Sequence, residues 1–341
     1  MLAKLEKFAR WETALAGTVV FEFIVFTLIN PNFANPARVL RSMPDFIYLG
    51  IAALPLAIIM LSGGIDISFG SVASLSAITA GVVFVRTGSM VMGVTLALLV
   101  SLLCGLANGL LITTTKSIPM VITLGTQFLF AGLALGVSGL GGVSSFEGIS
   151  GLPAWFNAIS NGRLLGIPRL IWIFVVTACV FAFVMSKTTF GRQIRLIGVN
   201  VEAADYAGFR TSRLLVTAYA LMGITAGLVG LLLTSYVGSA RADVGIPLLM
   251  PVLTLVVIGG ISMNGGEGSI TGVIIATFVI GFLQQGLRFV GLNENEVAVV
   301  TGFVLIVVAS LRWWTIAGSE KFKNLKARKR VSQEKVAQVA N

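Results

Sequence analysis

The chain has 341 residues, of which 56% are hydrophobic and 11% are charged, and its formal net charge is +10. Ordinary soluble domains carry about 25% charged residues, so this composition excludes a soluble enzyme and predicts an integral membrane protein. Nucleic-acid binding is also excluded, because it needs a basic face on a soluble fold, whereas Lys and Arg here flank apolar segments.

Apolar runs along the chain predict an all-α, polytopic fold. A membrane core about 30 Å thick needs about 20 helical residues, and that rule divides the chain into ten expected spans. They lie near 13–30, 45–62, 71–86, 90–113, 119–140, 168–186, 213–236, 246–262, 268–290 and 296–313. The expected organisation is a basic cytoplasmic amino terminus at 1–12, a transmembrane domain at 13–313 and a basic tail at 314–341. The tail lacks a long apolar face, so we expect a disordered anchor at the lipid surface.

Two glycine pairs interrupt the apolar pattern, each eight residues after a proline, at Pro55 and Pro251. Proline and paired glycines in apolar runs predict broken or paired membrane helices, which expose backbone groups to a polar solute. The duplication predicts two related halves, in which Asp66 aligns with Ser262. Close helix packing is the alternative use of the glycines, and Asp66 and Ser68 can equally cap the next helix. The predicted gate comprises Gly63, Gly64, Asp66, Ser68, Gly259, Gly260 and Asn264.

Polar side chains inside the expected spans suit a small hydroxylated solute that needs hydrogen bonds to replace water. Such residues also tie membrane helices together for about 0.6 kcal/mol each, and both interpretations stay open. Glu22 lies in the first span, where a carboxyl group is either bonded to a neighbouring helix or used in transport. The predicted solute path comprises Asn108, Thr123, Thr126 and Gln127, and Tyr219, Gln284 and Gln285 are further polar residues in spans.

The longest inner loop, 187–213, is expected to contain a short helix. Asn200 can cap it, Glu202 and its two alanine neighbours favour it, and Gly208 can end it. A capped helix on a cytoplasmic loop predicts a docking element; an elbow between two membrane helices is the alternative.

The distribution of cations predicts that both termini are cytoplasmic, because Lys and Arg concentrate on the inner side of membranes. With that orientation both glycine pairs lie on the cytoplasmic side. Seven cations remain outside, namely Arg38, Arg41, Arg86, Arg163, Arg169, Arg241 and Arg288.

Several motifs between Glu12 and Leu311 resemble the permease subunits of bacterial ABC importers for ribose and related sugars. They are GGIDISFGS at 63–71, TLGT at 123–126, GRQIRLIGVNVEAADYAG at 191–208 and GGISMNGGEG at 259–268. The resemblance implies about ten spans in each of two permeases that pair around a central path. It also implies that the inner loop couples to an ATPase through the pattern G-x-N-x-x-A-A-x-x-x-G. The matching positions are Gly198, Asn200, Ala203, Ala204 and Gly208. Glu202, at a variable position of the pattern, is predicted to belong to the coupling residues with them. Asp205 departs from relatives that are basic there.

Within this family, SFEGISG at 145–151 and GFLQQGL at 281–287 resemble the autoinducer-2 importers. The resemblance implies an inner-membrane subunit that works with ATPase subunits, a second, different permease and a periplasmic solute-binding protein. A ribose or other monosaccharide permease is the alternative. No G-x-x-x-x-G-K-[ST] occurs in the chain, so we expect ATP hydrolysis on a separate subunit.

Functions of other classes have less support. A proton-coupled transporter using Glu22 or Asp66 is disfavoured because the chain has no histidine and few buried carboxylates to form a relay. A membrane enzyme is disfavoured because neither a general base nor metal-ligand spacing is evident. We expect no cofactor and no metal, and Cys104 and Cys179 are expected to be buried hydrophobes.

Overall fold

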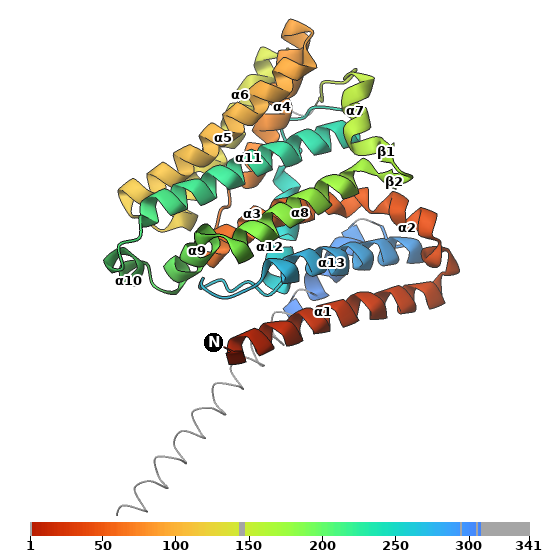
Figure 1. Ribbon diagram of the computed structural model, residues 1–341. Coiled ribbons are helices and arrows are strands. Elements are labelled where there is room, and N and C mark those ends of the chain that lie inside the picture. The colour runs from red at the N-terminus through yellow and green to blue at the C-terminus, as the bar shows by residue number, and fades with distance from the viewer. Residues whose placement is uncertain (1, 143–146, 294, 305, 308–341) are drawn as a thin grey trace, which may run out of the picture. The chain divides into compact units, whose positions relative to one another are not determined.

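The computed structural model describes residues 2–142, 147–293, 295–304 and 306–307. The chain divides into two units at Gly291. The first unit is almost entirely helical (Figure 1). Its elements are α1 (Leu2–Ile29), η1 (Pro31–Ala34), α2 (Pro36–Ser42), α3 (Pro44–Leu61), α4 (Phe69–Thr87), α5 (Met90–Thr115), α6 (Pro119–Leu140), α7 (Ala154–Asn161), β1 (Arg163–Leu164), β2 (Ile167–Pro168), α8 (Arg169–Lys187), α9 (Thr189–Val199), α10 (Val201–Tyr206), α11 (Thr211–Val237), η2 (Ile246–Leu248), α12 (Leu249–Ile258) and α13 (Ile270–Val290).

Eight helices within the described residues are long and apolar enough to cross a membrane. They confirm the polytopic all-α prediction, and eight of the ten expected spans coincide with them. The expected span at 246–262 is instead η2 followed by α12, a helix of 10 residues, because Pro247 and Gly245 break the chain just before it. Predictions for 308–341, including the end of the last span and the tail, lie outside the described residues.

The second unit is described only in part. Residues 295–304 form a short apolar helix. Asn293 caps it, since Oδ1 accepts hydrogen bonds from the N–H groups of Asn295 and Glu296, and the Glu296 carboxylate accepts from the Asn293 N–H at 2.8 Å. Reciprocal capping of this kind stabilises a helix start.

The interior of the first unit is built around α3 and α4. Of the residues that could cross a membrane, 89% are buried in α3 and 72% are buried in α4. Small residues in α4, such as Ala73 and Ala77, allow neighbouring helices to approach closely. Pro55 lies within α3 without interrupting it. Cys104 is buried as expected, but Cys179 is exposed on α8, because the apolar α8 has a free outer face.

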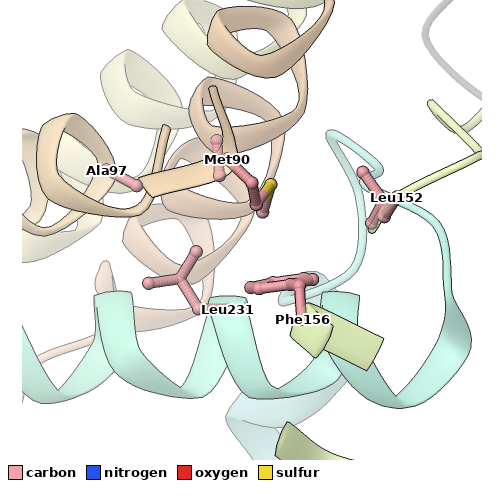
Figure 2. Close-up of a cluster of buried hydrophobic side chains, with 6 residues drawn as sticks. Met90, Ala97, Leu152, Phe156 and Leu231 are labelled. Atoms are coloured by element: carbon pink, nitrogen blue, oxygen red, sulfur yellow. The ribbon is translucent and has the colours of Figure 1, made fainter. Parts of the chain in front are cut away.

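The β1–β2 hairpin and α9 lie at opposite ends of α8, since one directly precedes it and the other directly follows it (Figure 1). Near the hairpin end, a buried apolar cluster joins α7 to α5 and α11. Figure 2 shows Leu152 and Phe156 packed toward Met90, Ala97 and Leu231.

Gln285 donates a hydrogen bond of 2.7 Å to Asp45, which also accepts one from the Tyr236 hydroxyl. Gln285 therefore ties helices together, the second of the two roles open to polar residues in spans.

Candidate functional site

Both glycine pairs end a helix rather than interrupt one. At the end of α3, Gly63 has a left-handed backbone with φ +87°. The N–H groups of Gly63 and Gly64 donate to the carbonyls of Met60 and Ile59, each at 3.0 Å. This is the Schellman cap, in which a left-handed residue satisfies the last carbonyls of a helix.

The second pair forms the same cap one position later. At the end of α12, Gly260 is the left-handed residue, with φ +93°, and its N–H donates to the Val257 carbonyl at 3.0 Å. Gly63 therefore corresponds to Gly260 by cap geometry, and the predicted alignment of Asp66 with Ser262 is shifted by one residue. Counting from the first glycine of each pair missed this because only the backbone shows which glycine turns.

The short helix that the sequence predicts in loop 187–213 is confirmed as α10. Asn200 is its N-cap, and its Oδ1 accepts a hydrogen bond of 2.9 Å from the Ala203 N–H. Gly208, with φ +81°, follows the helix end. Ala204 is 4% exposed and faces inward, whereas Glu202 and Ala203 are exposed.

Apolar side chains surround the exposed face of α10. Tyr206 is 93% exposed and Val199 is 69% exposed, and Leu196 and Val201 are also exposed. A cluster of exposed apolar groups on a polar loop is typical of a protein-binding surface. We call these four residues with Glu202 and Ala203 the α10 surface.

The loops that contain the two glycine pairs, 62–68 and 259–269, are called the glycine loops below. Gly198, at the end of α9, brings loop 187–213 into backbone contact with both. A Cβ on Gly198 would overlap the Leu61 carbonyl at the end of α3 and lie 2.5 Å from the Gly266 nitrogen. Gly266 in turn donates a hydrogen bond of 2.9 Å to that Leu61 carbonyl. Three separate sequence motifs thus meet at one point.

Two longer side chains reinforce this meeting point. Arg195 of α9 donates a hydrogen bond of 2.9 Å to the Gly268 carbonyl. Burial lowers the pKa of this guanidinium, although an arginine stays charged at physiological pH. Trp11 of α1 donates to the Ile258 carbonyl at 2.9 Å and packs against Gly260. The sequence interpretation missed Trp11 and Arg195, because both simply lie beside apolar runs and nothing else sets them apart.

Asp66 and Ser68 lead a buried polar cluster beside the first glycine loop. Asp66 Oδ1 accepts hydrogen bonds from the Ser68 N–H at 2.8 Å and the Ser68 hydroxyl at 2.7 Å, and Asn108 Nδ2 donates to the Ser68 oxygen at 2.8 Å. The Asp66 carboxylate therefore accepts a backbone N–H at the start of α4. The Ser68 side chain makes no capping hydrogen bond there. Burial raises the pKa of the Asp66 carboxyl to about 6, and the bonds from Ser68 oppose that rise.

The structure brings only part of the predicted path to this cluster. Thr123 joins it, since its hydroxyl donates to the Ile65 carbonyl at 3.0 Å. Asn108 Oδ1 and the Tyr219 hydroxyl are buried next to it and make no hydrogen bond among the described residues. By contrast, Thr126 bonds within its own helix and Gln127 is half-buried on α6. Asn264, a member of the predicted gate, is exposed.

Glu22 is buried on α1, at 8% exposure, and its Oε2 has no hydrogen-bond partner among the described residues. Glu22 lies on α1, whereas Asp66 lies in the loop between α3 and α4. The described residues contain no group of His, Cys, Asp or Glu that could hold a metal ion.

Comparison with known proteins adds independent information. The family model described as branched-chain amino acid transport system / permease component matches residues 38–309. The chain is 44% identical to the autoinducer 2 import system permease protein LsrD of Salmonella paratyphi B and 45% identical to that of Escherichia coli. Each alignment spans 298 residues, covering 87% of this chain and 90% of the relative. No solved structure matches the chain.

Proposed function

Because this chain belongs to the family of branched-chain amino acid transport permease components, we propose that it is a membrane-spanning subunit of an ATP-driven importer whose solute is autoinducer-2. The solute follows from the relatives, which are named as autoinducer 2 import permeases and match nearly the whole chain. Ribose or another monosaccharide is the runner-up, because a pocket for either solute uses the same hydroxyl-binding residues.

The observation that carries this function is the meeting of α9 with both glycine loops at Gly198. In our proposal a separate ATPase subunit binds the α10 surface. Its movement displaces α9, and the rigid backbone contact transmits the displacement to the ends of α3 and α12. The coupling residues are Gly198, Asn200, Glu202, Ala203, Ala204 and Gly208.

The same proposal assigns the remaining parts. A second, homologous permease completes the path, and a periplasmic solute-binding protein delivers the solute. The chain lies in the bacterial inner membrane with both termini and the α10 surface on the cytoplasmic side, which the concentration of cations at that end supports. The gate consists of the two glycine loops, and Asn108 and Thr123, next to the first of them, contact the solute as it leaves.

Uptake in cells that lack their own autoinducer-2 and ribose importers tests the function. We expect labelled autoinducer-2 to enter only when the chain is expressed together with an ATPase, a second permease and a periplasmic binding protein. Entry of ribose alone would move the solute to the runner-up. Loss of uptake on adding an uncoupler at constant ATP would contradict ATP-driven transport.

Cross-linking tests the docking surface directly. A photo-cross-linking residue in place of Ala203, which is exposed, is expected to capture the ATPase subunit in the assembled importer. The matched control is the same replacement at Ala204, because Ala204 is only 4% exposed and points into the chain. Capture at both positions or at neither would contradict docking through the α10 surface.

A further inference from the structure

The segment after α11 does not form the outer loop that the sequence predicts, but lies alongside a membrane-spanning helix. Ala240 pairs with Ile149 through two backbone hydrogen bonds of 2.9 and 3.0 Å, and its Cβ lies against Gly81 of α4. Five residues later, the Gly245 N–H donates to the Ser74 hydroxyl at 2.9 Å, and Gly245 packs on Gly70. The segment therefore follows about three turns of α4, in the opposite direction.

Arg241 and Asp243 lie between these two anchors. Arg241 Nε donates to Asp243 Oδ1 at 2.9 Å, and Nη2 donates to Oδ2 at 2.7 Å. The two side chains are 40% and 27% exposed at the surface of the chain. The sequence interpretation counted Arg241 as an outer cation, because an irregular segment inserted beside a helix leaves no hydrophobic signal.

A charged pair at this depth cannot face lipid without a large cost, and charged residues inside membrane domains face water-filled cavities or protein. Irregular backbone at membrane depth is likewise tolerated only where it is buried in protein or lines such a cavity. Gly70 and Gly81 bury one side of the segment against α4. The exposed sides of Arg241 and Asp243 therefore face a water-filled cavity or protein in the assembled importer.

We propose that Arg241 and Asp243 form a binding site for a neutral, polyhydroxylated solute in the translocation path, an inference that rests on the proposed function. The bidentate contact uses two of the five N–H donors of the guanidinium, so donors remain beside carboxylate oxygens that accept. Each solute hydroxyl both donates and accepts, and two neighbouring hydroxyls match this alternation. The pair has no net charge, which favours a neutral solute over an anion or a cation.

Thiol labelling tests whether the pair faces water, without relying on transport. In the full importer with Cys104 and Cys179 replaced by serine, we expect Asp243→Cys to react with a membrane-impermeant thiol reagent. Autoinducer-2 or ribose, whichever the importer carries, is expected to slow that reaction. Leu165→Cys at the exposed hairpin tip is the labelled control, and Phe128→Cys on the apolar face of α6 is the unlabelled one. Failure of Asp243→Cys to react, or reaction that neither solute slows, overturns the inference.

Uptake by conservative variants tests the binding role. We expect Arg241→Gln and Asp243→Asn each to raise the KM for uptake by about ten- to hundredfold, the loss expected for one hydrogen bond to a charged group, with ATP hydrolysis retained. Arg163→Gln on the hairpin is the matched control and should keep the wild-type KM. An exchanged pair, Arg241→Asp with Asp243→Arg, separates binding from structure. Recovery of the wild-type KM in the exchanged pair, or unchanged KM in the single variants, overturns the inference, whereas a wild-type importer that carries neither solute contradicts the proposed function itself.

Discussion

Replacing Gly198 by alanine is expected to lower ATP-driven uptake by about tenfold or more while the chain still inserts into the membrane. The new Cβ would overlap the Leu61 carbonyl and approach the Gly266 nitrogen to 2.5 Å. Both are backbone atoms at the ends of structured segments, so neither can move aside as a flexible side chain would. Overpacking of this kind costs about 1–3 kcal/mol. We expect the added methyl group to push α9 away from both glycine loops.

The measurement is uptake per inserted molecule, with ATP hydrolysis by the assembled importer recorded in parallel. Because the α10 surface is intact in Gly198→Ala, we expect ATP hydrolysis to persist while uptake falls. Gly132→Ala is the control: it makes the same change on α6, where a Cβ meets nothing within 4 Å, and should transport normally. Wild-type uptake by Gly198→Ala would show that the contact with Leu61 and Gly266 does not carry the coupling.

The local chemistry of the coupling region was predictable from sequence, but its assembly was not. Asn200 and Gly208 predict the two ends of α10, because capping depends on residues within one turn of the helix end. The sequence analysis predicts only this one short helix in 187–213, and the preceding segment, 189–199, carries Gly191 and Gly198, which lower helix propensity. In the structure α9 forms nonetheless, since Gly191 packs closely on the Met185 backbone and Gly198 on Leu61. These glycines are required for tertiary contact, which no local pattern reveals.

Length and hydropathy located the eight long helices but misjudged depth where the chain is irregular. Residues 237–245 lie between two expected spans and carry the charged Arg241 and Asp243, the pattern of an outer loop, and only the contacts of Gly70, Gly81 and Ser74 place them beside α4. The glycine pairs show the same limit. Their composition indicated helix ends or breaks, but which glycine adopts the left-handed conformation depends on where each helix stops.

The second large effect is expected where α5 and α11 cross. A Cβ on Gly105 would overlap the Tyr219 carbonyl and lie 2.9 Å from the Gly223 Cα, and one on Gly223 would overlap the Ser101 carbonyl and lie 2.8 Å from the Gly105 Cα. The two backbones are thus in direct contact, as small residues permit between membrane helices. Gly105→Ala and Gly223→Ala are each expected to destabilise the chain by about 1–3 kcal/mol, measured as a lower unfolding temperature in detergent and less folded protein in membranes.

The sign of the effect separates packing from helix propensity. Alanine in place of a helical glycine is otherwise stabilising by about 0.5–1 kcal/mol, so Gly132→Ala and Gly136→Ala on α6, where a Cβ meets nothing within 4 Å, should be neutral or stabilising. In the double variant Gly105→Ala with Gly223→Ala, both methyl groups widen the same crossing. The helices that the first methyl group has separated need little further movement for the second, so the double variant should lose less stability than the two single losses together. Equal shifts in the α6 and crossing variants, or strict additivity at the crossing, would contradict backbone contact between α5 and α11.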